Sequence, residues 1–111
     1  MDANEYQKKA LKSLNPNLNK EEVLINSVMG LCGEAGEAID IVKKTIHQGH
    51  EFNKEKFILE LGDIAWYLAE ASHAVGYDLN TVLELNLNKL NKRYPDGFKT
   101  NDSIKRLDEK E

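Results

Sequence analysis

The sequence is poor in residues that interrupt helices and in residues that cross-link chains. Among its 111 residues are two prolines, Pro16 and Pro95, and one cysteine, Cys32. A single cysteine cannot form an intramolecular disulfide, so nothing indicates an oxidising compartment. No apolar run approaches the roughly 20 residues of a membrane helix, and the polar start MDANEYQKKALKS lacks the apolar stretch of a signal peptide. We therefore expect a cytoplasmic protein without membrane contact.

An excess of positive charge is also missing. The chain carries 15 basic and 19 acidic residues, a formal net charge of −4. Binding to a nucleic-acid polymer usually requires a basic face, so we expect no such partner. A small phosphorylated ligand remains compatible, because a bound metal ion can supply the missing positive charge. The length fits one domain with a real core.

The apolar pattern has helical periodicity without strand-like alternation, which predicts an all-α chain. We expect helices over about residues 4–14, 20–47 and 54–75, and a fourth that starts near residues 78–80 and reaches residue 93. The segments NPNLN, QGHEFN, GY and YPDG separate or end them. Residues 1–98 are expected to form one helical domain, and residues 99–111 a charged, loose C-terminal tail.

The second and third helices each carry one apolar stripe on a helical wheel, which predicts two core faces. The expected core residues are Leu24, Val28, Leu31, Cys32, Ala35, Ala38, Ile39, Val42 and Ile46, with Phe57, Ile58, Leu61, Ile64, Ala65, Leu68 and Val75. Leu59 and Trp66 lie together on the opposite side of the third helix. A second apolar side in so short a chain predicts contact with another subunit, and stacking of Trp66 on a base is the alternative.

Two pairs of acidic residues stand beside these stripes. GEAGE supplies Glu34 and Glu37, and ELGD supplies Glu60 and Asp63; we call these four residues the motif carboxylates. Each pair is spaced i, i+3 and therefore shares a helical face. If the two helices pack antiparallel, the four groups converge and repel unless a cation is present. All-oxygen ligation favours Mg²⁺, with Mn²⁺ as a substitute. The alternative is two ordinary solvated surface pairs.

Glycines accompany the acidic motifs: Gly30, Gly33 and Gly36 in the second helix and Gly62 in the third. Each costs about 1 kcal/mol relative to alanine inside a helix. Two explanations are compatible, namely close helix packing and room for a ligand over the carboxylates.

Polar and basic residues share one face of the fourth helix. Asn86, Lys89 and Arg93 follow the spacing i, i+3, i+7. Lysine and arginine suit phosphate oxygens, although a solvated basic face is the alternative. Lys44 lies one heptad after Glu37 and is a further candidate for substrate contact.

The motifs GEAGEAIDIVKK, ELGDIAWYLA and NLNKLNKRYPDGF resemble the MazG-like nucleotide pyrophosphohydrolases. The first two motifs are separated by 22 intervening residues, 38–59, and the resemblance extends from Asn4 to Phe98. It implies a four-helix-bundle-like, all-α fold that assembles into a homodimer or homotetramer. It also implies Mg²⁺-dependent hydrolysis of a nucleoside triphosphate, (d)NTP, to monophosphate and pyrophosphate, for nucleotide-pool control or housecleaning.

The resemblance assigns roles by matching motif. The four motif carboxylates would hold Mg²⁺, Glu34 or Glu37 would accept the proton of the attacking water, and Lys89 and Arg93 would approach the phosphates. The chain departs from many members at Gly33, where they carry a further glutamate. Two alternatives remain open: a non-catalytic helical oligomerisation module, and a phosphoribosyl-ATP pyrophosphohydrolase.

Overall fold

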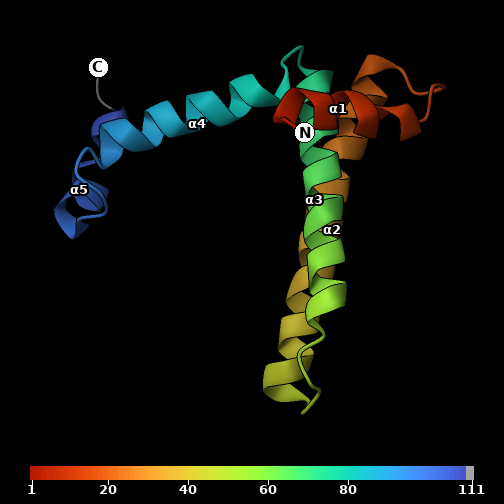
Figure 1. Cartoon of the computed structure of the whole chain (residues 1–111), viewed down its shortest axis with the longest axis horizontal. Coiled ribbons are helices and arrows are strands. Elements are labelled where there is room, and N and C mark those ends of the chain that lie inside the picture. Colours follow the sequence, from red (N-terminus) through yellow and green to blue (C-terminus); the bar gives the residue numbers. More distant parts are fainter. Residues whose placement is uncertain (110–111) are drawn as a thin grey trace. The chain divides into compact units, whose positions relative to one another are not determined.

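A computed structural model describes residues 1–109 as helices joined by loops (Figure 1). The elements are α1 (Ala3–Ala10), η1 (Leu11–Ser13), α2 (Lys20–His47), α3 (Lys54–Ala74), α4 (Leu79–Arg93), α5 (Thr100–Lys105) and η2 (Leu107–Glu109). No strand occurs within residues 1–109, which confirms the all-α prediction. None of the helices described is long and apolar enough to cross a membrane.

Asparagine caps set the starts of the two long helices. The Asn19 side chain accepts a hydrogen bond from the backbone nitrogen of Glu22 (2.9 Å), and the Glu22 carboxylate accepts one from the backbone nitrogen of Asn19 (3.1 Å). At α3, Asn53 accepts from the backbone nitrogen of Lys56 (3.1 Å). These contacts satisfy amide groups that a helix start leaves without partners. Gly76, with φ +83°, follows α3 and allows the chain to turn toward α4.

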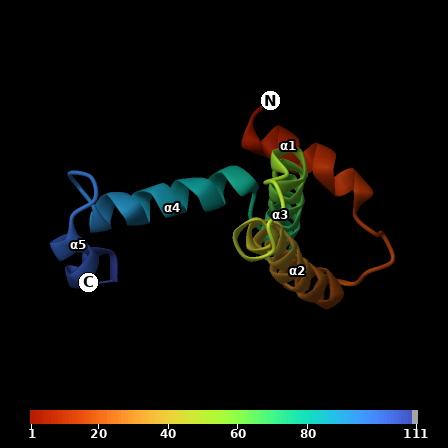
Figure 2. The same ribbon diagram turned by 90° about the horizontal axis from the view of Figure 1, so that it is seen from below.

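Helices α2 and α3 pack antiparallel as a hairpin, and α1 crosses the end at which α2 begins and α3 finishes (Figures 1 and 2). The buried residues of α2 recur at helical spacing and form its contact face: Val23, Ser27, Ala38 and Ile41. Across from them, the Glu70 side chain is fully buried and accepts hydrogen bonds at both carboxylate oxygens from the Asn26 amide (3.0 Å each). The seam is therefore partly polar.

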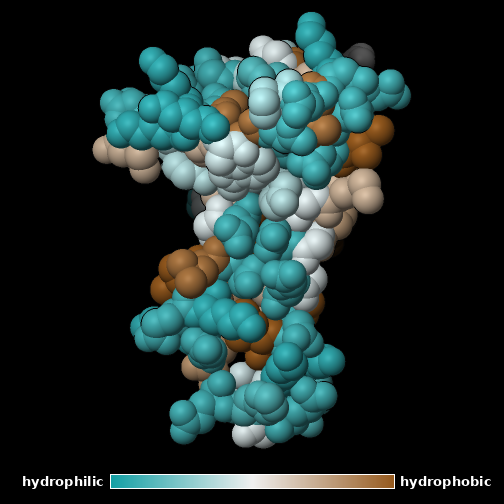
Figure 3. Space-filling model, turned by 90° about the vertical axis from the view of Figure 1, so that its right-hand side faces the viewer, coloured by the Kyte–Doolittle hydropathy of each residue, from teal (hydrophilic) through white to brown (hydrophobic). Residues whose placement is uncertain are grey.

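The predicted core stripes were wrong in large part. Of the expected α2 residues, Ala38 is buried, whereas Leu24, Val28, Cys32, Ala35, Ile39 and Ile46 are exposed. Of the expected α3 residues, Ile58, Leu61 and Val75 are exposed. The contact face is narrow and includes Ser27, Gly30 and Glu34, so the direction of greatest hydrophobicity does not point at it. Figure 3 shows hydrophobic side chains at the surface along the hairpin.

A buried glutamine fixes α1 to the hairpin. The Gln7 side-chain nitrogen donates to the backbone oxygens of Ala69 (3.1 Å) and Tyr77 (3.3 Å), and its oxygen accepts from the backbone nitrogen of Leu79 (2.9 Å). One side chain thus satisfies three backbone groups where α3 ends and α4 begins.

Trp66 also packs within its own chain, so its predicted role as a partner-facing residue is corrected. Its indole nitrogen donates to the backbone oxygen of Ala10 (2.9 Å) and to the Ser13 hydroxyl (3.0 Å). The α1–η1 segment covers this side of α3, which the helical wheel of α3 alone did not reveal. Leu59 is 70% exposed.

The chain from Asn80 onward forms a second compact unit, separate from Met1–Leu79. The expectation of a loose tail was wrong, because α5 and η2 follow Phe98. The Arg93 guanidinium donates two hydrogen bonds to the two carboxylate oxygens of Asp108 (2.9 Å each), whose side chain is 1% exposed. This paired contact ties η2 to the end of α4. The last two residues of the predicted tail lie outside the described residues.

Candidate active site

Three of the four motif carboxylates converge. One carboxylate oxygen from each of Glu34, Glu37 and Glu60 lies within 4.8 Å of the other two. The i, i+3 spacing directs the first two from one face of α2, and the antiparallel packing brings Glu60 of α3 against them. Glu60 is nine-tenths buried, with 9% of its surface exposed.

Asp63 stands beside this trio rather than in it. It is exposed one helical turn after Glu60, and it lines a hollow together with Glu34. Its negative charge reaches Glu34, where it contributes to raising the pKa of that carboxyl group. Asp63 is therefore near enough to Glu34 to act on its charge, although it is not one of the three converging groups.

The cluster has unmet hydrogen-bonding capacity. One oxygen of Glu34 and one of Glu60 are buried without a hydrogen-bond partner in residues 1–109. The pKa of Glu34 is raised from 4.5 to about 7, first by a proton shared with Glu60, then by desolvation and the charges of Glu37 and Asp63. A buried oxygen without a partner is costly, and a shared proton or a cation relieves that cost. An all-carboxylate donor set fits a hard cation such as Mg²⁺ or Mn²⁺.

Two hollows flank the cluster. The first, of about 410 Å³, is here called the glycine hollow; its lining is Gly33, Gly36, Glu37, Asp40, Ile41, Lys56 and Glu60. The second, of about 370 Å³, is here called the aromatic hollow; its lining is Ser13, Glu34, Asp63, Trp66 and Tyr67. The carboxylate cluster contributes residues to both, so a ligand that contacts the cluster can extend in two directions.

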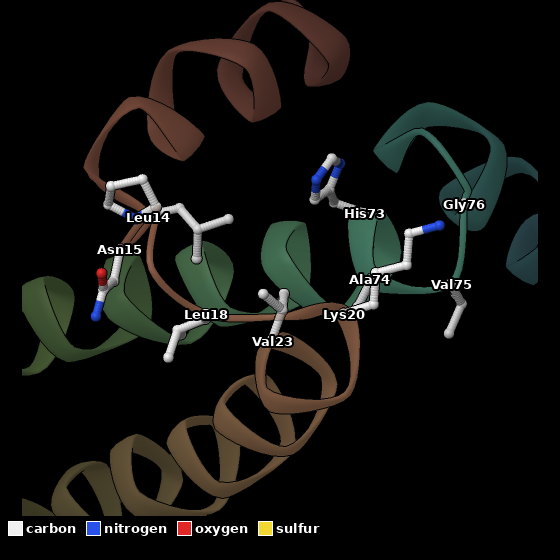
Figure 4. Close-up of a pocket in the computed structure, with 10 residues that line it drawn as sticks. Leu14, Asn15, Leu18, Lys20, Val23, His73, Ala74, Val75 and Gly76 are labelled. Carbon is white, nitrogen blue, oxygen red and sulfur yellow. The ribbon is translucent and has the colours of Figure 1, made fainter.

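A larger hollow of about 550 Å³ lies between the loop that follows η1 and the end of α3 (Figure 4). Leu14, Leu18 and Val23 line it from one segment of the chain, and His73 lines it from the end of α3. It contains none of the predicted site residues, so it is separate from the carboxylate cluster.

Tyr67 is a site residue that the sequence reasoning missed. A Cβ atom placed on Gly30 would overlap the Tyr67 ring, so the absence of a side chain there lets the ring lie against α2. Trp66 meets Tyr67 edge to face, with ring centres 5.1 Å apart. Burial, and then the charge of Glu34, raise the pKa of Tyr67, so its phenol stays protonated at neutral pH. The available signal in the sequence was Gly30 itself.

Lys44, the candidate basic residue of α2, forms an ion pair with Asp40 near the carboxylate cluster. The Lys44 ammonium group contacts Asp40 at 2.9 Å, and Lys43 contacts the same carboxylate at 3.4 Å. The hydrogen bond from Lys44 lowers the pKa of Asp40 below its usual value. Asp40 lines the glycine hollow, so this lysine pair compensates one negative charge at the rim of that hollow.

The polar candidates of α4 belong to the second unit. Asn86 and Lys89 are exposed on their helix. Arg93 is 17% exposed in its side chain and directs two guanidinium donors at Asp108. The bonds from Arg93 hold the pKa of Asp108 well below its usual range. These are the donors that a phosphate group would take.

The comparison with known protein families agrees with the geometry of the cluster. Residues 24–98 match the model of the MazG nucleotide pyrophosphohydrolase domain, a span that contains all four motif carboxylates and all of α4. The chain belongs to the MazG nucleotide pyrophosphohydrolase family.

A bacteriophage protein is similar in sequence to this MazG-family chain. The Gene 37 protein of Mycobacterium phage L5 is 40% identical over 73 residues, which cover 62% of this chain and 64% of that protein. The chain therefore matches somewhat less than two thirds of the relative's length. No solved structure matches the chain significantly.

Proposed function

We propose that this MazG-family protein hydrolyses a nucleoside triphosphate, (d)NTP, to the monophosphate and pyrophosphate, and so controls or cleans a nucleotide pool. The observation that carries the proposal is the convergence of Glu34, Glu37 and Glu60, with two buried carboxylate oxygens that have no partner in residues 1–109. A cation would relieve the repulsion in such a cluster without a shared proton, and a triphosphate is a ligand that such a cation attracts.

The motif carboxylates are proposed to hold Mg²⁺, with Asp63 joining the trio. When bound, the ion would supply positive charge that polarises a phosphoryl oxygen and lowers the pKa of a water. The chain's own contribution is to fix the carboxylates on two packed helices, so that little reorganisation is needed as substrate binds.

Glu34 and Glu37 are the candidates to accept the proton of the attacking water. They leave α2 one turn apart, and Glu34 lines the aromatic hollow whereas Glu37 lines the glycine hollow. We assign the α-phosphorus of the substrate to the carboxylate cluster, which contributes lining residues to both hollows. A carboxylate within hydrogen-bond reach of the attacking water can act as its general base.

The remaining candidates are proposed to contact the substrate or a second copy of the chain. Lys44, Asn86, Lys89 and Arg93 supply polar and positively charged groups for phosphate oxygens. A homodimer or homotetramer is supported by the exposed apolar stripe of the hairpin, which includes Ile39 at 62% exposure.

Hydrolysis in ¹⁸O-labelled water tests the reaction. Attack at the α-phosphorus places the label in the monophosphate, and mass spectrometry should find it there and not in pyrophosphate. Glu60→Gln should lower turnover by a hundredfold or more, roughly the loss for a group of the catalytic centre. The matched control is Glu55→Gln, an exposed glutamate on the same helix, which should keep activity. Release of diphosphate and orthophosphate instead would reject the proposed reaction.

A further inference from the structure

The two hollows differ in chemistry. Among the residues that line the glycine hollow there is no aromatic ring, and Gly33 and Gly36 are part of its lining. The aromatic hollow presents Trp66 and Tyr67. A nucleoside offers a flat base and a sugar, which aromatic side chains contact well, whereas a phosphate chain needs space and positive charge.

We propose that the glycine hollow holds the pyrophosphate part of the substrate, and retains it as the leaving group, with Lys56 as its positively charged contact. The nucleoside then extends from the carboxylate cluster into the aromatic hollow. This inference rests on the proposed function, because it assigns the two ends of a triphosphate to the two sides of the same site.

The glycine hollow is lined in part by a buried acidic side chain. Glu60 lines it, is nine-tenths buried (9% exposed), and has one oxygen without a partner in the described chain. A Cβ atom at Gly33 or Gly36 would meet no atom of the described residues within 4 Å. Packing within the chain therefore does not explain these two glycines, each of which costs about 1 kcal/mol relative to alanine. The open space above these two glycines leaves room for a ligand.

Lys56 is positioned to serve that ligand. It precedes Glu60 by four residues on α3, so the two side chains lie on one helical face. It occupies the first turn of its helix, where the helix dipole disfavours a cation. Lys43 and Lys44 contact Asp40, whereas Lys56 makes no ion pair within residues 1–109.

The charges of the hollow set a condition on binding. Glu37, Asp40 and Glu60 all line it, and they repel a pyrophosphate anion. Lys43 and Lys44 compensate Asp40, which leaves two carboxylates against the single charge of Lys56. Pyrophosphate binding therefore requires the divalent cation, and Lys56 strengthens it.

Titration calorimetry with inorganic pyrophosphate in excess Mg²⁺ measures this directly. Lys56→Gln should weaken pyrophosphate binding about tenfold, as expected for one partly exposed charge-assisted contact. Lys54→Gln is the matched control: it makes the same charge change in the same helical turn, but does not line the hollow. It should bind pyrophosphate as the wild type does. Affinity for the monophosphate product should be unchanged in both variants.

Three results would overturn the inference: unchanged pyrophosphate affinity in Lys56→Gln, an equal loss in Lys54→Gln, or an equal loss of monophosphate affinity. Circular dichroism verifies that each variant is folded, and removing a cation from a helix start should not destabilise it. If the wild type hydrolyses triphosphates while one of these results is obtained, the proposed function stands and this inference fails. If the wild type hydrolyses no triphosphate, the proposed function itself fails.

Discussion

Gly30→Ala tests how tightly the site is built into the seam between α2 and α3. The added methyl group would overlap the Tyr67 ring, and that ring is held edge to face against Trp66. Trp66 in turn donates hydrogen bonds to the α1–η1 segment, so the ring cannot move without disturbing a second contact. Overpacking of this kind costs about 1–3 kcal/mol.

The net effect follows from two opposing contributions. Replacing a helical glycine by alanine contributes up to about 1 kcal/mol of stability. Gly30→Ala should therefore lower the free energy of unfolding by as much as about 2 kcal/mol, the larger overpacking cost less the helical gain. Gly33→Ala has the same helical gain without a clash, because its Cβ would meet open space, and should stabilise. The difference between the two variants isolates the clash.

Urea denaturation at a fixed protein concentration, without metal, measures both free energies. Gly33→Ala should exceed Gly30→Ala by about 1–3 kcal/mol, the overpacking cost alone. Equal stability of the two variants would show that the Tyr67 ring does not lie on Gly30. The positioning of the aromatic hollow would then need another explanation.

Two further predictions concern titration and the second unit. The pKa of Glu34 is raised from 4.5 to about 7, so the metal-free folded chain keeps a proton that the unfolded chain releases. Its contribution to stability is complete below pH 4.5 and declines as the pH rises toward 7, and Glu34→Gln should flatten this decline in pH-dependent denaturation. Asp108→Asn should speed proteolysis after Arg93 by roughly tenfold or more, because a charge-assisted contact is lost. The exposed Asp96→Asn is its control, and equal cleavage of both variants would contradict the structural role.

The sequence allowed the helices to be predicted because their signals are local. The span 20–47 expected for the second helix agrees with α2. The capping box at its start can be recognised in the sequence from Asn19 and Glu22. The end of α3 at Gly76 was predicted from the sequence in the same way. The convergence of Glu34, Glu37 and Glu60 could also be predicted, since it needs only i, i+3 spacing and antiparallel packing.

The packing faces could not be predicted from the same signals. A helical wheel finds the most apolar direction, but the seam of α2 runs through Ser27, Gly30 and Glu34. The choice of face depends on contacts between segments far apart in the sequence, such as the bond from Trp66 to Ala10. The structure of the tail after Phe98 was not predicted for the same reason. It depends on a hydrogen bond from Arg93 to Asp108, fifteen positions away. Composition alone marks such a tail as solvated.

The same polar seam explains why the apolar stripe lies outside. Carboxylates contributed by two helices can converge only where those helices meet, as Glu34, Glu37 and Glu60 do. Placing them in the seam excludes large apolar side chains from that contact and leaves Val28 and Ile39 at the surface, 51% and 62% exposed. A second copy of the chain carries a matching stripe, and the proposed homodimer or homotetramer would bury both. If the proposed assembly covers this stripe, substitutions at Val28 or Ile39 that weaken it should also loosen the carboxylate cluster.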